Sequence, residues 1–452
     1  MLRFFIAQAL LGEKWQHNVT LEVNDRGVIA AIIPDSEPGD ATQLTGAMIP
    51  AMTNLHSHAF QRAMAGLTEV AGDPQDSFWT WREQMYRLVG RLTPEQVGVI
   101  ARHLYCDLLR GGYTQVAEFH YLHHDFSGLP YAQDEMLQQL LAAAVDSGIG
   151  QTLLPVLYSY AGFGAQPPQP AQRRFIQSSD QYLAQQDRLA HLITPYPLIN
   201  RGLCFHSLRA VSESQISQVL SASAADLPVH IHVAEQQKEV DDCLAWSRQR
   251  PVEWLLDHVD VDARWCLIHA THMTPPEIER LARSQAVAGL CPTTEANLGD
   301  GIFPATAYLA AQGRWGIGSD SHVSLSALEE LRWLEYAQRL RDCRRNRLTS
   351  SATPGVGNLL WQQAAQGGAQ ACGLALGKLA VGYRADWLLL DDAAWFSGCT
   401  DEQRLNCWLF AGDNRQIRDV FVAGKQVIHQ GRHRNDEQNA RQLRTVMQAL
   451  YS

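Results

Sequence analysis

Residues 227–235 read LPVHIHVAE, a short apolar run that ends in two histidines and a glutamate. Comparable runs occur before and after it, and longer helix-forming stretches separate them. The runs include TQVAEF (114–119), QTLLPVLY (151–158), WCLIHATH (265–272) and AVAGLCP (286–292), and the helical stretches include 94–110, 134–147, 237–249 and 275–283. Alternating strands and helices indicate a parallel sheet, and this many repeats favour a closed barrel over an open sheet. We predict an α/β protein with a (β/α)8 TIM-type barrel over residues 50–376.

The two ends of the chain have a different, β-rich pattern. FFIAQALL (4–11) and VTLEVN (19–24) are strand-like near the start, and LAVGYRADWLLLDD (379–392) and IRDVFVAGKQVIHQG (417–431) are strand-like near the end. Ala423-Gly424 predicts a hairpin turn, and residues 436–450 are polar and helix-forming. We therefore expect residues 1–49 and 377–452 to form one small β-sandwich-like domain with a C-terminal helix, with the barrel inserted between its halves.

Composition is that of a compact enzyme. The chain has 452 residues, of which 46% are hydrophobic and 19% are charged, and its formal net charge is −10. These values argue against disorder, and the lack of a Lys/Arg run argues against nucleic acid as a partner. A small anionic substrate remains compatible with them, because the charge inside a pocket can oppose the charge of the whole protein.

Neither a signal peptide nor a membrane span is expected. The N-terminus, MLRFFIAQALLGEKW, lacks a basic leader and a small-residue cleavage site, and no apolar run reaches about 18 residues. The nine cysteines are scattered and form no CxxC pair. Buried thiols in a reducing cytoplasm are the simplest interpretation.

Histidines and acids follow several of the predicted strands. In Asn54-Leu55-His56-Ser57-His58, residues two apart on a strand face the same side, so His56 and His58 can reach one metal ion. His232, His269 and Asp320 also fall at strand ends, where barrel active sites are assembled. Each residue alone is compatible with a hydrogen-bonded core histidine or a helix cap. Together they predict a divalent metal site, preferably for Zn²⁺.

Lysine limits the number of metal ions. Two-metal sites of this kind commonly use a carboxylated lysine as a bridge, but the chain has no lysine between His58 and His232. We predict one ion per chain, unless a glutamate or a cysteine forms the bridge. Glu118, which is near the end of TQVAEF, is the candidate for that role.

The ordered motifs HSH, HVAE, LIHATH and GSDSH resemble the amidohydrolase superfamily across essentially the whole chain. NLHSHAFQR (54–62), GLTE (66–69) and HSLRAV (206–211) narrow the resemblance to the formimidoylglutamate deiminases of histidine breakdown. The resemblance implies that His56, His58, His232 and Asp320 bind the metal and that Glu235, His269 and Asp320 are catalytic. It moves His269 out of the ligand set, which spacing alone could not decide.

The implied reaction is the hydrolysis of N-formimino-L-glutamate to N-formyl-L-glutamate and ammonia. Zinc lowers the pKa of bound water from 15.7 to about 7, and Glu235 would carry a proton to the departing nitrogen. Asp320 could accept a hydrogen bond from the water, with electrostatic help from His269. The alternative for Glu235 is a carboxylate favoured by a helix start. His230 is interpreted as a packed core histidine, and His272 and His322 stay ambiguous.

The substrate would be a small dicarboxylate, which arginine binds with a planar pair of hydrogen bonds. Arg209, after the strand-like GLCFHSL, is the first candidate, and Arg82 is the second. Gln61, Tyr121 and His206 are expected to add hydrogen bonds. Arg62 could equally face a neighbouring helix, and single arginines are often solvated surface charges. The aromatic residues Phe78, Trp79 and Trp81, in the 70–90 segment, suit either a lid or helix packing.

Two other functions remain open at this point. A nucleobase aminohydrolase of the guanine or cytosine deaminase type would use the same metal chemistry with a flatter, less basic pocket. A metal-free scaffold protein would lack the ligands and the acid that this chain retains. Barrels of this group often pair, so a homodimer is one expectation, although the sequence identifies no interface.

Overall fold

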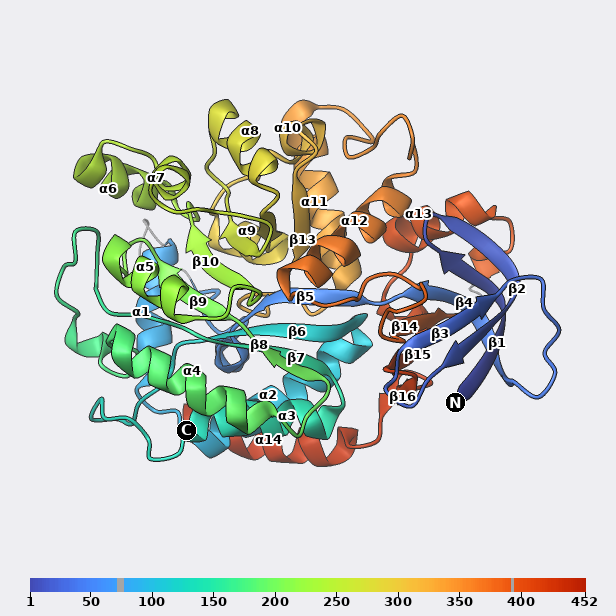
Figure 1. The fold of residues 1–452 in the computed structure, drawn as a ribbon, viewed down its shortest axis with the longest axis horizontal. Helices are drawn as coiled ribbons and strands as arrows, with labels where there is room; N and C mark the ends of the chain where they lie inside the picture. Colours follow the sequence, from blue (N-terminus) through green and yellow to red (C-terminus); the bar gives the residue numbers. More distant parts are fainter. Residues whose placement is uncertain (71–76, 392–393) are drawn as a thin grey trace.

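The computed structural model describes residues 1–70, 77–391 and 394–452. It contains one eight-stranded sheet and two smaller sheets of five and four strands. In Figure 1 the eight-stranded sheet lies at one end of the molecule, and the two smaller sheets lie among the helices that make up the rest. None of the helices described is both long enough and apolar enough to span a membrane.

Both ends of the chain contribute to the eight-stranded sheet, and β4 pairs with β14 to join them. Its strands, in sheet order, are β17 (Arg432–His433), β16 (Lys425–His429), β15 (Ile417–Val422), β14 (Trp387–Leu390), β4 (Thr42–Pro50), β1 (Leu2–Leu11), β2 (Lys14–Val23) and β3 (Ile29–Ile33). One face carries a separate core in which Phe4, Trp387 and Phe421 pack together. The predicted hairpin is confirmed, because Ala423 and Gly424 both have positive φ between β15 and β16.

The two smaller sheets are parallel throughout. One contains β5 (Met52–Ser57), β6 (Tyr113–His120), β7 (Gly150–Pro155) and β8 (Ile199–Arg201); the other contains β9 (Leu203–Ser207), β10 (Val229–Val233), β11 (Trp265–His269), β12 (Val287–Leu290) and β13 (Arg314–Ile317). Single parallel bridges, Ser57 to Asp320 and Leu157 to Phe205, link the two sheets. The predicted α/β class with parallel strands is confirmed.

Helices follow most of these strands and cover them on the outside (Figure 1). They are α1 (Phe78–Val89), α2 (Pro94–Arg110), α3 (Glu135–Ser147), α4 (Ser179–Ile193), α5 (Glu213–Ala222), α6 (Gln237–Ser247), α7 (Pro251–His258), α8 (Pro275–Ser284), α9 (Pro292–Leu298), α10 (Ala305–Ala310), α11 (Ala327–Asp342), α12 (Val356–Ala371), α13 (Asp401–Ala411) and α14 (Asp436–Tyr451). The predicted helix over 94–110 is confirmed at both ends. Its start is fixed locally, because Thr93 caps the amide of Gln96 and Pro94 needs no hydrogen-bond acceptor.

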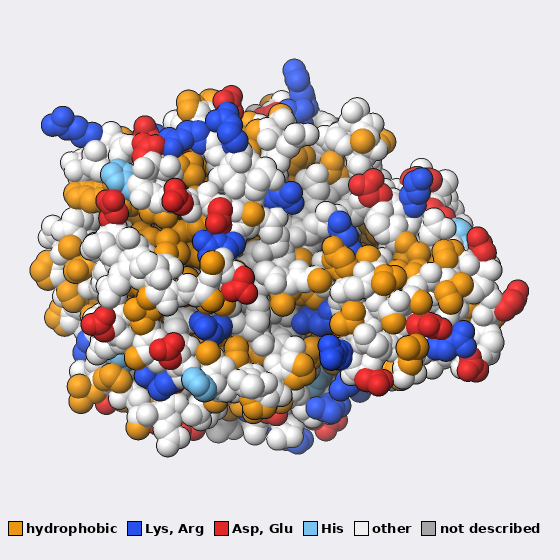
Figure 2. Space-filling view, in the orientation of Figure 1, with side chains coloured by type: hydrophobic (Ala, Val, Ile, Leu, Met, Phe, Trp, Pro, Cys, Tyr) orange, Lys and Arg blue, Asp and Glu red, His pale blue; other side chains and the backbone are white. Residues whose placement is uncertain are grey.

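Six of the nine cysteines are buried, as expected, but Cys399 and Cys407 are partly exposed and Cys343 is exposed. Cys343 ends α11 in the left-handed conformation, with φ of 50°. That position carries the side chain into solvent. The surface in Figure 2 intersperses Lys/Arg with Asp/Glu side chains over its described part.

Candidate active site

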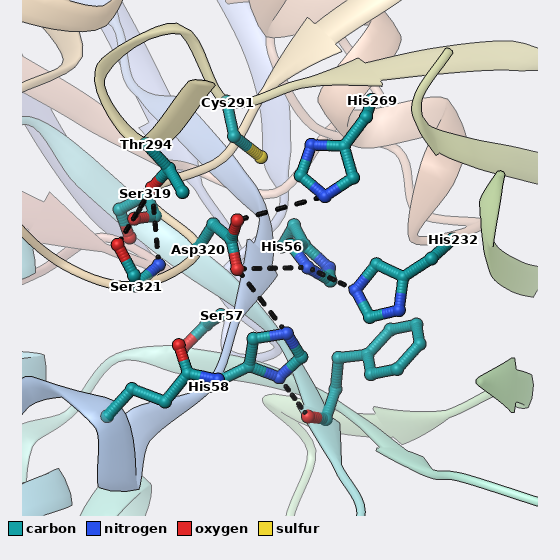
Figure 3. A network of polar contacts seen from close by, with 12 residues as sticks. His56, Ser57, His58, His232, His269, Cys291, Thr294, Ser319, Asp320 and Ser321 are labelled. Carbon is teal, nitrogen blue, oxygen red and sulfur yellow. Dashed lines mark hydrogen bonds and ion pairs between the residues drawn. The ribbon is translucent and has the colours of Figure 1, made fainter. Parts of the chain in front are cut away.

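Five polar side chains converge where parallel strands end. His56 is on β5 with His58 just after it, His232 is on β10, His269 ends β11, and Asp320 follows β13. Figure 3 shows all five pointing toward one another. The Nε2 atoms of His56 and His232 lie 3.0 Å apart, and the Nε2 atoms of His56 and His58 each lie 3.4 Å from Asp320 Oδ1.

Hydrogen bonds behind the ring hold two of these histidines in a metal-binding orientation. His58 Nδ1 lies 2.7 Å from the carbonyl oxygen of Phe119, and His232 Nδ1 lies 2.9 Å from that of His206. A donating Nδ1 leaves Nε2 with a free lone pair. Burial lowers the pKa of His56 and His232 well below the usual value, and lowers that of His58 to about 3.

These residues fit a divalent metal ion. Neutral imidazoles and a carboxylate are the donors that zinc takes in proteins. His56, His58 and Asp320 form one group whose ligand atoms lie within 4.8 Å of one another, and His56, His232 and His269 form another. The geometry therefore brings all the predicted ligands together, with His269 beside them.

Glu118 does not point to the metal group, although the sequence made it a candidate bridge. Its carboxylate accepts hydrogen bonds from Ser57 Oγ (2.6 Å), from the Ala59 amide (2.7 Å) and from the Tyr105 hydroxyl (3.0 Å). It is absent from the groups of metal-binding geometry found among the described residues. Because Ser57 and Ala59 flank His58, Glu118 instead braces the turn that presents this histidine.

Glu235 and His269 form an acid–base pair beside the metal group. His269 Nε2 lies 3.7 Å from Glu235 Oε1 and 3.8 Å from Asp320 Oδ2. Burial raises the pKa of Glu235 to about 7. Burial lowers the pKa of His269, but Glu235, Glu295 and Asp320 outweigh it and raise the value to about 10. A glutamate with a pKa near neutrality is suited to both taking and giving a proton.

Sequence reasoning missed Glu295, on α9. Its Oε1 lies 3.3 Å from His269 Nδ1 and also accepts the amide of Cys291. It therefore holds the ring of His269 from behind, on the side opposite Glu235. No motif spacing marks it, because the contact joins two side chains that are 26 residues apart in the sequence.

Several strand ends have an unusual backbone. Ala234, His269, Ala270, Asp320 and His322 all have positive φ, between 45° and 74°. Residues other than glycine rarely adopt this conformation, and it costs free energy. The bends come where the chain leaves β10, β11 and β13, so they aim Glu235, His269 and Asp320 into the site.

A cavity of about 50 Å³ opens beside the metal group, and every predicted substrate-binding residue lines it. Its lining, besides the metal and acid–base residues, consists of Gln61, Phe78, Trp81, Arg82, Met85, Tyr86, Tyr121, Tyr158, Phe175, His206, Arg209 and Leu298. Gln61 donates to the Tyr121 hydroxyl at 3.0 Å. Buried atoms without a hydrogen-bond partner in the described structure include Gln61 Oε1, Arg82 Nε and Arg209 Nε. The cavity therefore presents unsatisfied polar groups to a ligand.

Helix α1 covers this cavity, and Phe78 and Trp81 face into it. Two of the three aromatic residues in the 70–90 segment thus contribute to the wall of the cavity, whereas Trp79 does not. Tyr86, Tyr158 and Phe175 are further wall residues that the sequence did not single out. Residues 71–76 of the same segment lie outside the described residues.

Other candidate residues are held away from the cavity. Arg62 donates to the carbonyl oxygen of His322 at 2.6 Å. His230 lies 2.7 Å from the carbonyl oxygen of Ala371, in agreement with a packed core histidine. The ring of His322 lies between Ser57 and Ser319, and His272 contacts the carbonyl oxygen of Asp300. These groups support the site from behind or pack the core.

The chain belongs to the amidohydrolase family, whose model matches residues 47–427. It is 58% identical to formimidoylglutamate deiminase from Pseudomonas aeruginosa over 454 residues, which cover all of both chains. It is 29% identical to 8-oxoguanine deaminase from the same organism, over 83% of this chain and 81% of that one.

Solved structures agree with this assignment. An amidohydrolase from Brucella melitensis superposes with a TM-score of 0.95 at 43% identity, over all of both chains. An adenosine deaminase from Xanthomonas campestris with bound zinc superposes with a TM-score of 0.82 at 23% identity, over 99% of this chain and 98% of that one. At that lower identity the likeness concerns the fold.

Proposed function

We propose that this chain is a formimidoylglutamate deiminase, a hydrolase that acts on the C–N bond of a linear amidine. It converts N-formimino-L-glutamate and water to N-formyl-L-glutamate and ammonia, in histidine degradation. The full-length identity of 58% to a deiminase of that name supports this activity. The observation that carries it is one cavity lined by two arginines, Arg82 and Arg209, whose buried Nε atoms have no hydrogen-bond partner among the described residues, next to a histidine–aspartate group.

One divalent ion per chain, preferably Zn²⁺, would be held by His56, His58, His232 and Asp320. The low pKa values of the three histidines keep their lone pairs free at neutral pH, and the bracing of Glu118 by three donors leaves it out of a second site. When bound, such an ion lowers the pKa of water and so supplies a nucleophile near neutral pH.

Glu235 would act as the general base and then the general acid of the reaction. Attack of water on the formimino carbon makes a tetrahedral centre, and its nitrogen leaves as ammonia only after protonation. With a pKa of about 7, the Glu235 carboxylate can accept a proton from the water and pass it to that nitrogen. The imidazolium of His269, held by Glu295, would stabilise the negative charge that gathers near Asp320.

Arg82 and Arg209 would bind the two carboxylates of the substrate. A planar guanidinium binds a carboxylate through two parallel hydrogen bonds. Gln61, Tyr121 and His206 line the same cavity and would position the rest of the substrate. A nucleobase would leave both guanidiniums without a partner, which disfavours the guanine or cytosine deaminase alternative.

The parallel strands would close into one (β/α)8 barrel over residues 50–376. β8 and β9 are separated by Gly202 alone and would count as one strand, which gives eight. The bridge from Ser57 to Asp320 would close the ring where β5 meets β13. Residues 1–49 and 377–452 would then form the small second domain. A homodimer and a cytoplasmic location also remain predictions.

Ammonia release distinguishes the candidate functions. The zinc-loaded enzyme is given N-formimino-L-glutamate, guanine or cytosine in parallel, and ammonia is measured with metal content. We expect ammonia from the first compound only, with about one zinc per chain. Release from guanine or cytosine alone would contradict the proposal, and a protein without metal or activity would support the scaffold alternative.

A further inference from the structure

Trp79, on α1, has three cationic side chains around one indole ring. The guanidinium carbon of Arg82 lies 4.5 Å from the ring centroid, and that of Arg209 lies 5.7 Å from it. The Nζ atom of Lys238, on α6, lies 5.6 Å from the same centroid. Arg82 is one helical turn from Trp79, whereas Arg209 follows β9. One ring therefore connects segments that are far apart in the sequence.

Trp79 is not part of the cavity lining, although its neighbours Phe78, Trp81 and Arg82 are. Its side chain is half-buried. The indole therefore contacts the two arginines without lining the cavity itself.

The two arginines need such support, because the Nε atom of each is buried without a hydrogen-bond partner in the described structure. Two guanidiniums in one cavity repel each other. Glu235 and Glu239 lie close enough to raise the pKa of Arg209 against the lowering effect of burial, so they also offer it alternative partners. An aromatic face attracts a cation without neutralising it, which leaves the hydrogen-bond donors of both guanidiniums available.

We propose that Trp79 is a positioning residue that sets the preference for a dicarboxylate. Its indole holds Arg82 and Arg209 as a spaced pair and keeps Arg209 from moving onto Glu235. The inference rests on the proposed function for the identity of the substrate, but the pairing of the two cations is a property of this site. Neither carboxylate is bonded to the reacting C=N carbon, so the effect falls on binding more than on the chemical step.

The experiment compares Trp79→Leu and Trp79→Phe in the full-length, zinc-loaded enzyme. Trp79→Leu removes the aromatic face, and Trp79→Phe keeps a smaller one. Trp333→Leu, at an exposed position of α11, is the matched control for loss of a tryptophan. Two ligands are titrated by calorimetry: L-glutamate, with two carboxylates, and N-formiminoglycine, with one. Steady-state kinetics with N-formimino-L-glutamate follow.

We expect Trp79→Leu to weaken glutamate binding and raise KM about 10-fold, within the range that cation–π contacts contribute. The affinity for N-formiminoglycine and kcat should each change less than about threefold. The glutamate affinity of Trp79→Phe should lie between those of wild type and Trp79→Leu. Equal weakening of both ligands, an unchanged affinity for glutamate, or a loss confined to kcat would overturn the inference.

Two further measurements distinguish a folding defect from a loss of the proposed role, and failure of this inference from failure of the proposed function. If Trp79→Leu does not fold, as judged by its thermal transition, the order of glutamate affinity from wild type through Trp79→Tyr to Trp79→Phe decides instead, and a flat order overturns the inference. If wild type binds glutamate but releases no ammonia from N-formimino-L-glutamate, the proposed function fails, while the role of Trp79 is still judged by the binding ratio.

Discussion

The two ends of the cavity are built differently. At the metal end, His58, His232 and Glu118 have hydrogen-bond partners within the protein, and their elements are buried parallel strands. At the α1 end, Arg82 and Arg209 have buried Nε atoms without a hydrogen-bond partner in the described structure, and they lie against an aromatic ring. At the first end the protein itself holds most of the side chains, although His56 Nδ1 has no hydrogen-bond partner in the described structure. At the second end the substrate would supply the missing partners.

This difference assigns the chemical step to the metal end of the cavity and substrate recognition to the α1 end. Groups that move protons or hold a metal must keep their geometry throughout the reaction, so they benefit from rigid strands and a fixed surrounding. Groups that select a ligand gain specificity when their unsatisfied donors match it, because a ligand without carboxylates leaves those donors unpaired. Substitutions at the metal end should therefore change kcat or metal content, and substitutions at the α1 end should change KM.

Removing the metal should have the largest effect. Exhaustive chelation is expected to reduce ammonia release to the background rate, because no described side chain replaces the acidified water. His58→Asn should behave in the same way, since it removes one donor. Activity and metal content are measured before and after zinc is restored, and restoration should recover the chelated wild type only. Full activity without metal would contradict the site.

Glu235→Gln should lower kcat by about 10²–10⁴-fold, the usual contribution of a positioned acid–base group. The amide keeps the size of the side chain but cannot transfer the proton. Metal content and KM should stay close to those of wild type, since Glu235 is not among the four proposed ligands. Steady-state kinetics with zinc analysis test this, and a loss of zinc from Glu235→Gln would instead make it a ligand.

Glu118→Gln should weaken zinc binding by about 10–100-fold, as expected when a group that orients a metal ligand is changed. The amide cannot accept from Ser57, Ala59 and Tyr105 together. Competition with a chelator measures the affinity. Tyr105→Phe removes one of the three donors and should have a smaller effect; an unchanged affinity in Glu118→Gln would leave this carboxylate a packing role.

Arg82→Met and Arg209→Met should each raise KM about 10-fold or more, the range for a lost hydrogen bond to a charged group. Zinc content should not change, because neither side chain belongs to the metal group. Lysine substitutions should recover only part of the affinity, since lysine lacks the two-pronged geometry. Kinetics of the four variants test this, and lysine variants equal to wild type would show that charge alone suffices.

The smallest expected effect is on the free energy of unfolding in acid, and it concerns a buried histidine on a strand of the metal end. Burial lowers the pKa of His120, at the end of β6, to about 4 from the usual 6.5. As pH falls below 6.5, the unfolded chain takes up a proton that the folded protein refuses, so stability present above 6.5 is lost toward pH 4. The free energy of unfolding should therefore fall with pH in this range, and His120→Gln should make that fall smaller by about 1.4 kcal/mol per pH unit. Unfolding is followed from pH 7 to 4.5, with exposed His17→Gln as control; equal slopes would contradict the shift.

Much of the framework could be predicted from the sequence, because it depends on local rules. The cap and proline at Thr93-Pro94 fix the start of α2, and Ala423-Gly424 fixes a hairpin. The two-residue spacing of His56 and His58 places both on one side of β5. The histidine and acid positions at later strand ends could be found in the same way, because parallel strands bring their carboxyl ends to one edge.

The remaining features of the site depend on contacts between segments far apart in the chain. Glu295 contacts His269 across 26 residues of sequence, and Glu118 turns away from the metal group because Ser57, Ala59 and Tyr105 surround it. Positive φ at His269 and Asp320 is not marked by glycine, so the sequence gives no sign of these bends. The sequence by itself determined the elements and the donor types, since periodicity and capping act over a few residues. The tertiary structure decided where each side chain points, since that depends on neighbours that only packing brings together.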